Sequence, residues 1–195
     1  MPNKTDAKTS ARERLLTAAD ELFYAEGVQT VGIDRIIEHA GVAKASLYNI
    51  FGSKEELVRA SLESRHASTN ERITRALRRF RTPRERLLGV FDALGELFTD
   101  PEFNGCAFIS ASAEAPHGSS VEQAADEYRA SMRAMFSDLA KEAGFADPDA
   151  VARQLHLLYD GATVSARMDR DPTSSTTARG AAAAILDAAP TIERV

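Results

Sequence analysis

The stretch from residue 40 to residue 57, AGVAKASLYNIFGSKEEL, decides the fold. Apolar residues before it recur at helical spacing, and these are Leu15, Leu16, Ala19, Leu22 and Phe23, followed by Ile33, Ile36, Ile37 and Ala40. Gly41 interrupts this pattern, as a short turn between two packed helices requires. The spacing of Leu47, Ile50 and Phe51 then predicts a short helix that turns these three side chains to the core. The pattern as a whole is typical of a helix-turn-helix.

The opposite face of this short helix combines a cation, small residues and hydrogen-bonding side chains, namely Lys44, Ala45, Ser46, Tyr48 and Asn49. Lys44 and Tyr48 are i, i+4 neighbours, as are Ala45 and Asn49, so the two pairs form adjacent rows. Asn can pair bidentately with adenine and Ala can contact a thymine methyl group. Such a helix fits the DNA major groove. We therefore expect duplex DNA as a partner.

The stretch from about Ser10 to Leu57 resembles the N-terminal domain of the TetR-type repressor family. The resemblance is carried by Ala18, Ala19, Leu22, Phe23, Gly27, Ile33, Ile36, Ala40, Gly41, Val42, Lys44, Leu47, Tyr48, Phe51, Ser53, Lys54 and Glu55. It implies phosphate contacts for Lys44 and Tyr48, and base or phosphate contacts for Ser46 and Asn49. Ser53 and Lys54 begin the next helix, whose free N–H groups form an anion site. The same reasoning applies more weakly to Thr30.

Composition sets limits on the class of protein. The 195 residues, 44% hydrophobic and 27% charged, suit one or two globular domains. A net charge of −5 argues against indiscriminate coating of nucleic acid. It permits site-specific binding through a local cationic face, for which Lys4 and Lys8 are additional candidates. No apolar run could span a membrane, the start of the chain lacks a signal peptide, and the single Cys106 fits a reducing compartment. We expect a cytoplasmic protein with no membrane partner.

Helix punctuation predicts an all-α fold of about nine helices. Capping boxes begin at Ser10, Ser53, Thr82 and Ser120, and no segment shows the alternation of a strand. The predicted helices cover residues 10–26, 33–40, 44–50, 54–79, 83–98, 106–115, 121–143, 148–168 and 175–189. We expect residues 1–53 to form a three-helix DNA-binding domain. The resemblance implies that residues 54–195 form a helical ligand-binding and dimerisation domain.

The fifth to seventh predicted helices hold much of the aromatic and methionine content. Most of these side chains are expected in the core, but such residues can also line a pocket for an apolar or amphipathic ligand. The resemblance places the effector pocket in this region. The candidates are Phe91, Leu94, Phe98, Phe103, Cys106, Ile109, Ser110, Tyr128, Met132, Met135 and Tyr159.

The last predicted helix is rich in alanine, whose small side chain permits close contact between helices. The tail could pack only on its own subunit, but the resemblance favours a homodimer built from the last two helices. A two-fold dimer requires a roughly palindromic operator. The interface candidates are Leu155, Leu158, Tyr159, Gly161, Ala162, Ala182, Ile185 and Leu186.

We expect a transcriptional repressor that a small ligand releases from DNA. One alternative is a helical small-molecule carrier or enzyme that keeps the reading-head fold. Another is a thiol-based redox regulator that uses Cys106, because a thiolate is stabilised at a helix start. The four histidines show no metal-ligand spacing and no catalytic motif stands out, so we expect no metal, no cofactor and no enzyme activity. The seven arginines between Arg72 and Arg86 are expected to form a solvated face.

Overall fold

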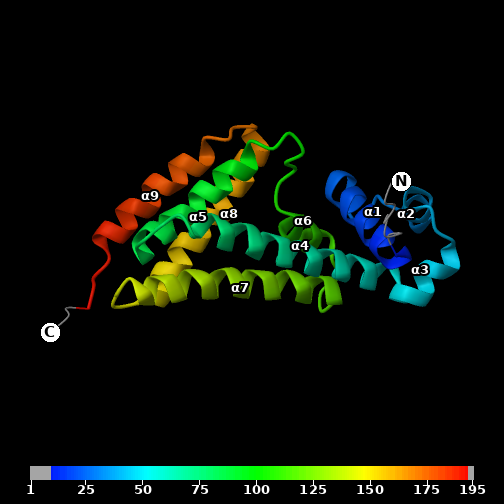
Figure 1. The fold of residues 1–195 in the computed structure, drawn as a ribbon, viewed down its shortest axis with the longest axis horizontal. Helices are drawn as coiled ribbons and strands as arrows, with labels where there is room; N and C mark the ends of the chain where they lie inside the picture. Colours follow the sequence, from blue (N-terminus) through cyan, green and yellow to red (C-terminus); the bar gives the residue numbers. More distant parts are fainter. Residues whose placement is uncertain (1–9, 193–195) are drawn as a thin grey trace, which may run out of the picture. The chain divides into compact units, whose positions relative to one another are not determined.

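The computed structural model describes residues 10–192, and this part of the chain forms nine α-helices and no strand (Figure 1). The helices are α1 Ala11–Glu26, α2 Ile33–Ala40, α3 Lys44–Phe51, α4 Lys54–Leu77, α5 Pro83–Phe98, α6 Ala107–Glu114, α7 Ser120–Glu142, α8 Pro148–Asp169 and α9 Ser174–Ala188. The all-α prediction is confirmed. Every predicted helix end lies within two residues of the observed one. Lys4 and Lys8, named as possible cations, lie outside the described residues.

Helix starts follow the predicted caps with one exception. The Ser10 hydroxyl accepts a hydrogen bond from the Glu13 N–H at 3.1 Å, and the Glu13 carboxylate accepts from the Ser10 N–H at 2.8 Å. The capping box predicted at Ser120 is wrong, because the hydroxyl of the preceding residue, Ser119, accepts from the Glu122 N–H. Ser120 instead donates its N–H and its hydroxyl to the Glu55 carboxylate, at 3.0 and 2.9 Å.

One compact unit contains the residues up to Arg65 together with Ala107–Ala125. In it, α1, α2 and α3 pack on one another. Their contact is built from fully buried apolar side chains, which include Leu15, Ala19, Ile36 and Leu47. Gly41 ends α2 in the left-handed conformation, with φ 62° and ψ 45°, which glycine adopts without steric strain. This turn sets the direction in which α3 leaves α2.

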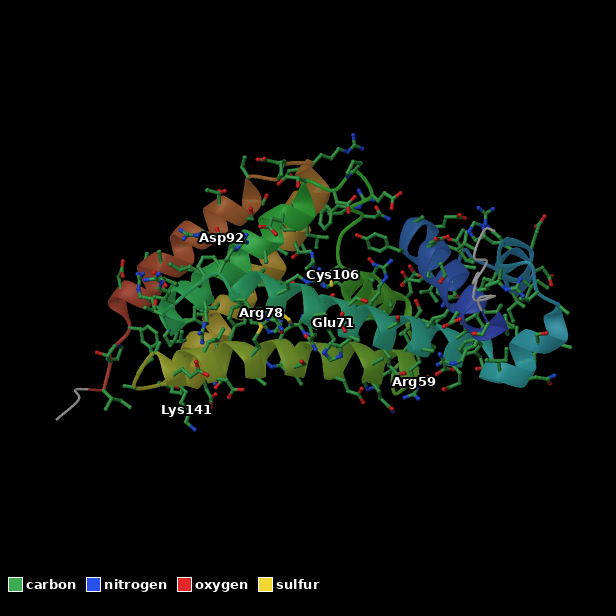
Figure 2. All side chains as sticks on the ribbon, viewed as in Figure 1. Arg59, Glu71, Arg78, Asp92, Cys106 and Lys141 are labelled. Carbon is green, nitrogen blue, oxygen red and sulfur yellow. The ribbon has the colours of Figure 1, made fainter. Side chains whose placement is uncertain are left out.

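The second compact unit contains His66–Cys106 and the residues from Asp126 onward. Helix α9 packs on both α5 and α8. Gly95 of α5 permits this contact, because a Cβ atom at that position would lie 2.7 Å from the Ser175 hydroxyl. Arg179 of α9 pairs with Asp92 of α5 at 2.9 Å, where Figure 2 labels Asp92. The core of this unit includes the buried rings of Phe91 and Phe136.

Contacts between residues assign helix α4 to both units, its first part up to Arg65 and its second part from His66. Helix α6 belongs to the unit that holds α1 to α3. The two units group residues by their contacts within the structure. The predicted division at residue 53 concerns domains that fold and act separately. That division stays a prediction.

Three of the seven arginines of the run form ion pairs within the chain. Arg79 pairs with Glu96 at 2.6 Å, Arg84 pairs with Asp187, and Arg86 lies 3.5 Å from Glu142. These pairs are exposed and therefore contribute little stability each. They engage the arginines with α5, α7 and α9, which agrees with the expectation that the run forms a solvated face.

Candidate nucleic-acid interface and effector region

Helix α3 buries one apolar side chain and exposes the predicted reading face. Leu47 is fully buried. Lys44, Ala45, Tyr48 and Asn49 are exposed, and Ser46 is half-buried. Tyr48 keeps 44% of its surface in solvent, although aromatic side chains dominate core and interface energetics when they are buried. The face that the sequence assigned to DNA is therefore free of contacts that would hide it.

The prediction that Ile50 faces the core is wrong. It is 38% exposed, whereas Phe51 is half-buried beneath the Arg12 guanidinium at 5.6 Å from the ring centroid. At 100° per residue, Ile50 lies about 60° to one side of Leu47 around the helix axis. An eight-residue helix anchored through the single buried Leu47 leaves that side uncovered.

Lys44, the cation of the reading face, has a partner that sequence spacing does not reveal. Its ammonium group lies 2.8 Å from the Asp34 carboxylate of α2. The hydrogen bond to Asp34 raises the pKa of Lys44, so the amine stays charged at physiological pH. Both side chains are exposed, so the pair is weak. Asp34 can orient Lys44 in the free protein and competes with a phosphate for it.

Lys54 connects α4 to the turn between α1 and α2. Its ammonium group donates to the Val28 carbonyl at 2.6 Å. Burial lowers the pKa of Lys54, and the negative charge of Glu114 offsets part of this effect. An ammonium has three donors, so two remain for other acceptors. Ser53 accepts from the Glu56 N–H at 3.1 Å, as a helix cap does. Thr30 in the same turn is exposed.

Helix α6 also holds this turn, through contacts that the sequence did not predict. The Glu114 carboxylate accepts from the Gln29 N–H at 2.7 Å, and the Gln29 amide donates to the Glu114 carbonyl at 3.2 Å. Gly27, with φ 89°, makes room for Glu114, because a Cβ atom there would lie 3.0 Å from the carboxylate oxygen. Residues 85 positions apart carry no local spacing signal, so only the fold reveals this pair.

Two helix starts of this unit present backbone N–H groups without a side-chain cap. Gly32 before α2 and Ala43 before α3 make no side-chain hydrogen bond to the first turn of the helix that follows. Such groups bind anions readily. Together with Lys44, they provide an arrangement that can position a phosphate backbone beside α3.

Most of the predicted pocket residues lie in the second unit. Phe91, Leu94, Phe98, Tyr128, Met132 and Tyr159 are buried there, and Phe103, Cys106 and Met135 are half-buried. Figure 2 labels Cys106 in the loop before α6. The half-buried Ile109 and the exposed Ser110 belong to the first unit. Ser110 there borders a space of about 20 Å³, which holds about one water molecule.

A polar group lies in the interior of the second unit. The Tyr128 and Tyr159 phenols share a hydrogen bond, and burial raises the pKa of both. They therefore stay neutral at physiological pH and can donate or accept hydrogen bonds. On α8, burial lowers the pKa of His156, an effect that Asp160 at 3.6 Å opposes. Arg129 pairs with the same carboxylate at 2.8 Å.

The predicted dimer residues require a correction. Leu155, Tyr159, Ala162, Ala182 and Leu186 are buried within one chain, because α9 packs on α5 and α8. They are therefore not on a free surface. Leu158 and Ile185 are half-buried, and Gly161 is exposed. The large apolar side chains that α8 exposes are other residues, Leu157 at 73% exposure, Val164 at 40% and Met168 at 76%.

The sequence predicted neither a metal site nor a membrane partner. Among residues 10–192, no group of three His, Cys, Asp or Glu side chains could hold a metal ion. In the same range, none of the helices is long and apolar enough to cross a membrane.

An all-helical chain with an exposed reading helix after a tight turn defines the class of helix-turn-helix transcriptional regulators. The family described as bacterial regulatory proteins, tetR family, matches residues 15–61. The fold resembles the solved structure of SCO4454, a TetR-family transcriptional regulator from Streptomyces coelicolor, with a TM-score of 0.85. The two sequences are 32% identical, and the match covers 92% of this chain and 89% of SCO4454. The chain belongs to the TetR family of DNA-binding transcriptional regulators.

Two curated relatives match over a shorter stretch. The transcriptional activator FasR of Mycolicibacterium smegmatis is 38% identical over 82 residues, 42% of this chain and 37% of the relative. The transcriptional repressor NemR of Escherichia coli K12 is 30% identical over 105 residues, 53% of each. The chain thus spans about half or less of these relatives. As a member of the TetR family, this protein is a DNA-binding transcriptional regulator and not an enzyme, and the carrier-or-enzyme alternative is set aside.

Proposed function

We propose that this TetR-family regulator is a cytoplasmic repressor that binds a palindromic operator as a homodimer and is released by a small apolar or amphipathic ligand. The observation that carries the DNA-binding part is the exposed face of α3. Lys44, Ala45, Tyr48 and Asn49 all face solvent around the buried anchor Leu47.

The proposed contacts to DNA are of two kinds. Contacts to phosphates position the protein on the duplex, and contacts to bases recognise the sequence. Lys44 and Tyr48 hold phosphates, supported by the uncapped start of α3. Asn49 and Ser46 read base edges, and Ala45 meets a thymine methyl group. Further phosphate contacts come from the Thr30 and Ser53 hydroxyls and from the two donors of Lys54 that Val28 leaves free.

The proposed dimer uses the outer stripe of α8 instead of the residues buried inside the chain. Leu157, Gly161, Val164 and Met168 follow one another at intervals of four, three and four, so they share one face. Large exposed apolar side chains in such a row are typical of a surface that another protein covers. Exposed alanines on α9, which include Ala181 and Ala184, permit a close approach.

The effector would bind among the aromatic residues of the second unit and act through α4, one helix with residues in both units. A ligand that favours one position of α4 changes the separation of the two reading helices in the dimer. The resulting coupling is reciprocal, so ligand and DNA weaken each other's binding. We also propose that residues 1–53 and 54–195 act as the two functional domains.

A binding-site selection with the purified full chain tests this function. A pool of random duplexes should yield a sequence with two-fold symmetry, bound with an affinity that falls steeply as salt increases. Enrichment of an asymmetric sequence, or none, would contradict the proposed dimeric reading. A reporter placed behind the selected operator then gives the sign, because a repressor lowers its expression and an activator raises it.

The same operator complex distinguishes a repressor released by a ligand from a thiol-based regulator that uses Cys106. Peroxide treatment should leave the complex intact if a ligand, and not Cys106, governs release. Peroxide-driven release that disappears in a Cys106→Ser protein would instead support a thiol-based regulator.

A further inference from the structure

We propose that the second unit binds a small amphipathic monoanion, an aromatic or short-chain carboxylate, between Phe98 and Phe103 on one side and Arg167 and Arg170 on the other. The inference concerns binding to the protein itself. It does not depend on the proposed release from DNA.

The end of α5 and the loop after it lie near the turn between α8 and α9 (Figure 1). Residues of these segments line a cavity of about 240 Å³. It is lined by Phe98, Asp100, Phe103, Ala166, Arg167, Arg170 and Pro172. Cavities for drug-sized ligands begin at roughly 300 Å³. This cavity therefore suits a ligand of one or two rings or a short chain.

One side of the cavity is aromatic, while Asp100 and the two arginines make the rest of the lining polar. The Phe98 and Phe103 rings lie 4.9 Å apart between centroids, tilted by 48°. Phe98 is buried and Phe103 is half-buried, so the second ring still offers surface to a ligand. Ala166 and Pro172 add apolar atoms. Such a wall favours a ligand with an apolar body over a bare inorganic anion.

Two arginines near the end of α8 border the cavity. Arg167 and Arg170 are exposed, and within residues 10–192 neither has an ion pair or a side-chain hydrogen bond. By contrast, Arg79, Arg84 and Arg86 of the arginine run each have a carboxylate partner. A guanidinium presents donors in a fork that matches a carboxylate.

The backbone fixes both arginines at this place. Arg170 is the one non-glycine residue in the described range with a positive φ, 55°, and it ends α8 in the left-handed conformation. Glycine or asparagine adopts that conformation at lower cost, so an arginine here points to a use for its side chain. The stem of Arg167 packs where Gly105 leaves room, since a Cβ atom there would lie 3.2 Å from the Arg167 Cγ.

The lining also limits the charge of the ligand. Asp100 is the single carboxylate of the cavity, and it accepts a hydrogen bond from the Glu102 N–H at 2.9 Å. Among the lining side chains alone, two guanidinium groups and one carboxylate give a net charge of +1. This balance suits a monoanion and disfavours a dianion such as a phosphate monoester.

Direct binding of 2-naphthoate to the full chain, measured by calorimetry, tests the inference. The matched neutral probe is 2-naphthalenemethanol, which has the same rings without the charge. The chain contains no tryptophan, so naphthoate fluorescence gives a second readout. We expect a Kd on the order of 1 mM or tighter for naphthoate. The alcohol should bind at least about tenfold more weakly, because it cannot form the charge-assisted pair. Equal binding of the two probes, or no binding of naphthoate, overturns the proposal.

The variants Arg167→Gln and Arg170→Gln should each weaken naphthoate binding about tenfold. Arg78→Gln is the matched control, because Arg78 is an exposed arginine of the same unit and should leave binding unchanged. Melting curves verify that each variant is folded. Arg170→Lys keeps the positive charge but loses the paired donors of the guanidinium group, so it should retain part of the affinity for naphthoate. Undiminished binding in both glutamine variants would place naphthoate elsewhere and refute this site. Operator binding and its release by another ligand would be unaffected by that result.

Discussion

Helices α3 and α9 differ in how clearly their sequences define their faces. Around α3 the residue types differ, with Leu47 on one side and Lys44 and Tyr48 on the other, and the structure exposes the side that the sequence assigned to solvent. Around α9 alanine occurs on every side. Ala182 is completely buried, while Ala184 is exposed.

The contrast teaches where periodicity fails. A hydrophobic pattern orients a helix only when the residues on its two sides differ in polarity. Alanine is compatible with a core and with a surface alike, because it is small and carries no polar group. For α9, the helices that cover it decide which alanines are buried.

Ala182→Glu should destabilise the whole fold. The new carboxylate would be buried between α9 and the helices α5 and α8 without a partner, at an expected cost of at least about 3 kcal/mol. Thr176→Glu, at an exposed position of α9 that the proposed dimer surface does not include, should melt close to the parent protein. Thermal unfolding followed by circular dichroism makes the measurement. A parent-like melting curve for Ala182→Glu would show that this side of α9 is not the packed one.

Leu157→Glu should leave the fold intact and produce monomers. Leu157 is 73% exposed, so the charge costs little within one chain but is unfavourable in a covered apolar stripe. Sedimentation velocity reports the oligomeric state, and operator affinity should fall with it. Ala134→Glu on the exposed side of α7 is the control. If Leu157→Glu sediments like the control, the interface lies on another surface.

Lys44→Ala and Tyr48→Ala should each weaken DNA binding by about tenfold across different sequences, because both are proposed to contact phosphates and not bases. Loss of the lysine should also reduce the salt slope by about one. Fluorescence anisotropy at several salt concentrations measures both quantities. Lys141→Ala removes an exposed lysine of α7 as a control. An unchanged affinity and slope in folded Lys44→Ala would refute the phosphate assignment.

Asp34→Asn should strengthen operator binding by about two- to fivefold, because Lys44 no longer has a competing carboxylate at 2.8 Å. The pKa of Lys44 would return toward its ordinary value, yet the amine would remain charged at physiological pH, so no new pH dependence should appear near neutrality. Glu38→Gln removes an equal charge from the exposed side of α2 without touching the pair. Equal gains in both variants would attribute the effect to net charge alone.

The smallest expected effect is that of Cys106→Ser on the oxidant response. One cysteine per chain has no resolving partner within the chain, so peroxide should affect operator binding equally in the parent and the variant. Gel-shift titrations with and without peroxide provide the comparison. An oxidant response lost only in the variant would assign a function to the thiol, through a bond between subunits.

Helix ends could be predicted well because their signals are local. Ser10 and Glu13 lie three residues apart and form their two hydrogen bonds as predicted. Ser120 failed because its neighbour Ser119 is equally able to cap, and the contact of Ser120 with the distant Glu55 selects between them. Local spacing cannot express a choice that depends on a residue 65 positions away.

The sequence by itself determined the helical class, the positions of the helices, the exposed polar face of α3 and the resemblance to the TetR family. These follow from periodicity, caps and side-chain chemistry within a few residues. Tertiary structure alone decided the partners of Lys44 and Lys54, the hold of Glu114 on Gln29, the buried side of α9, and the cavity between Phe103 and Arg170. Each of these depends on which distant helices come together, and that is set by the packing of the whole core and not by spacing along the chain.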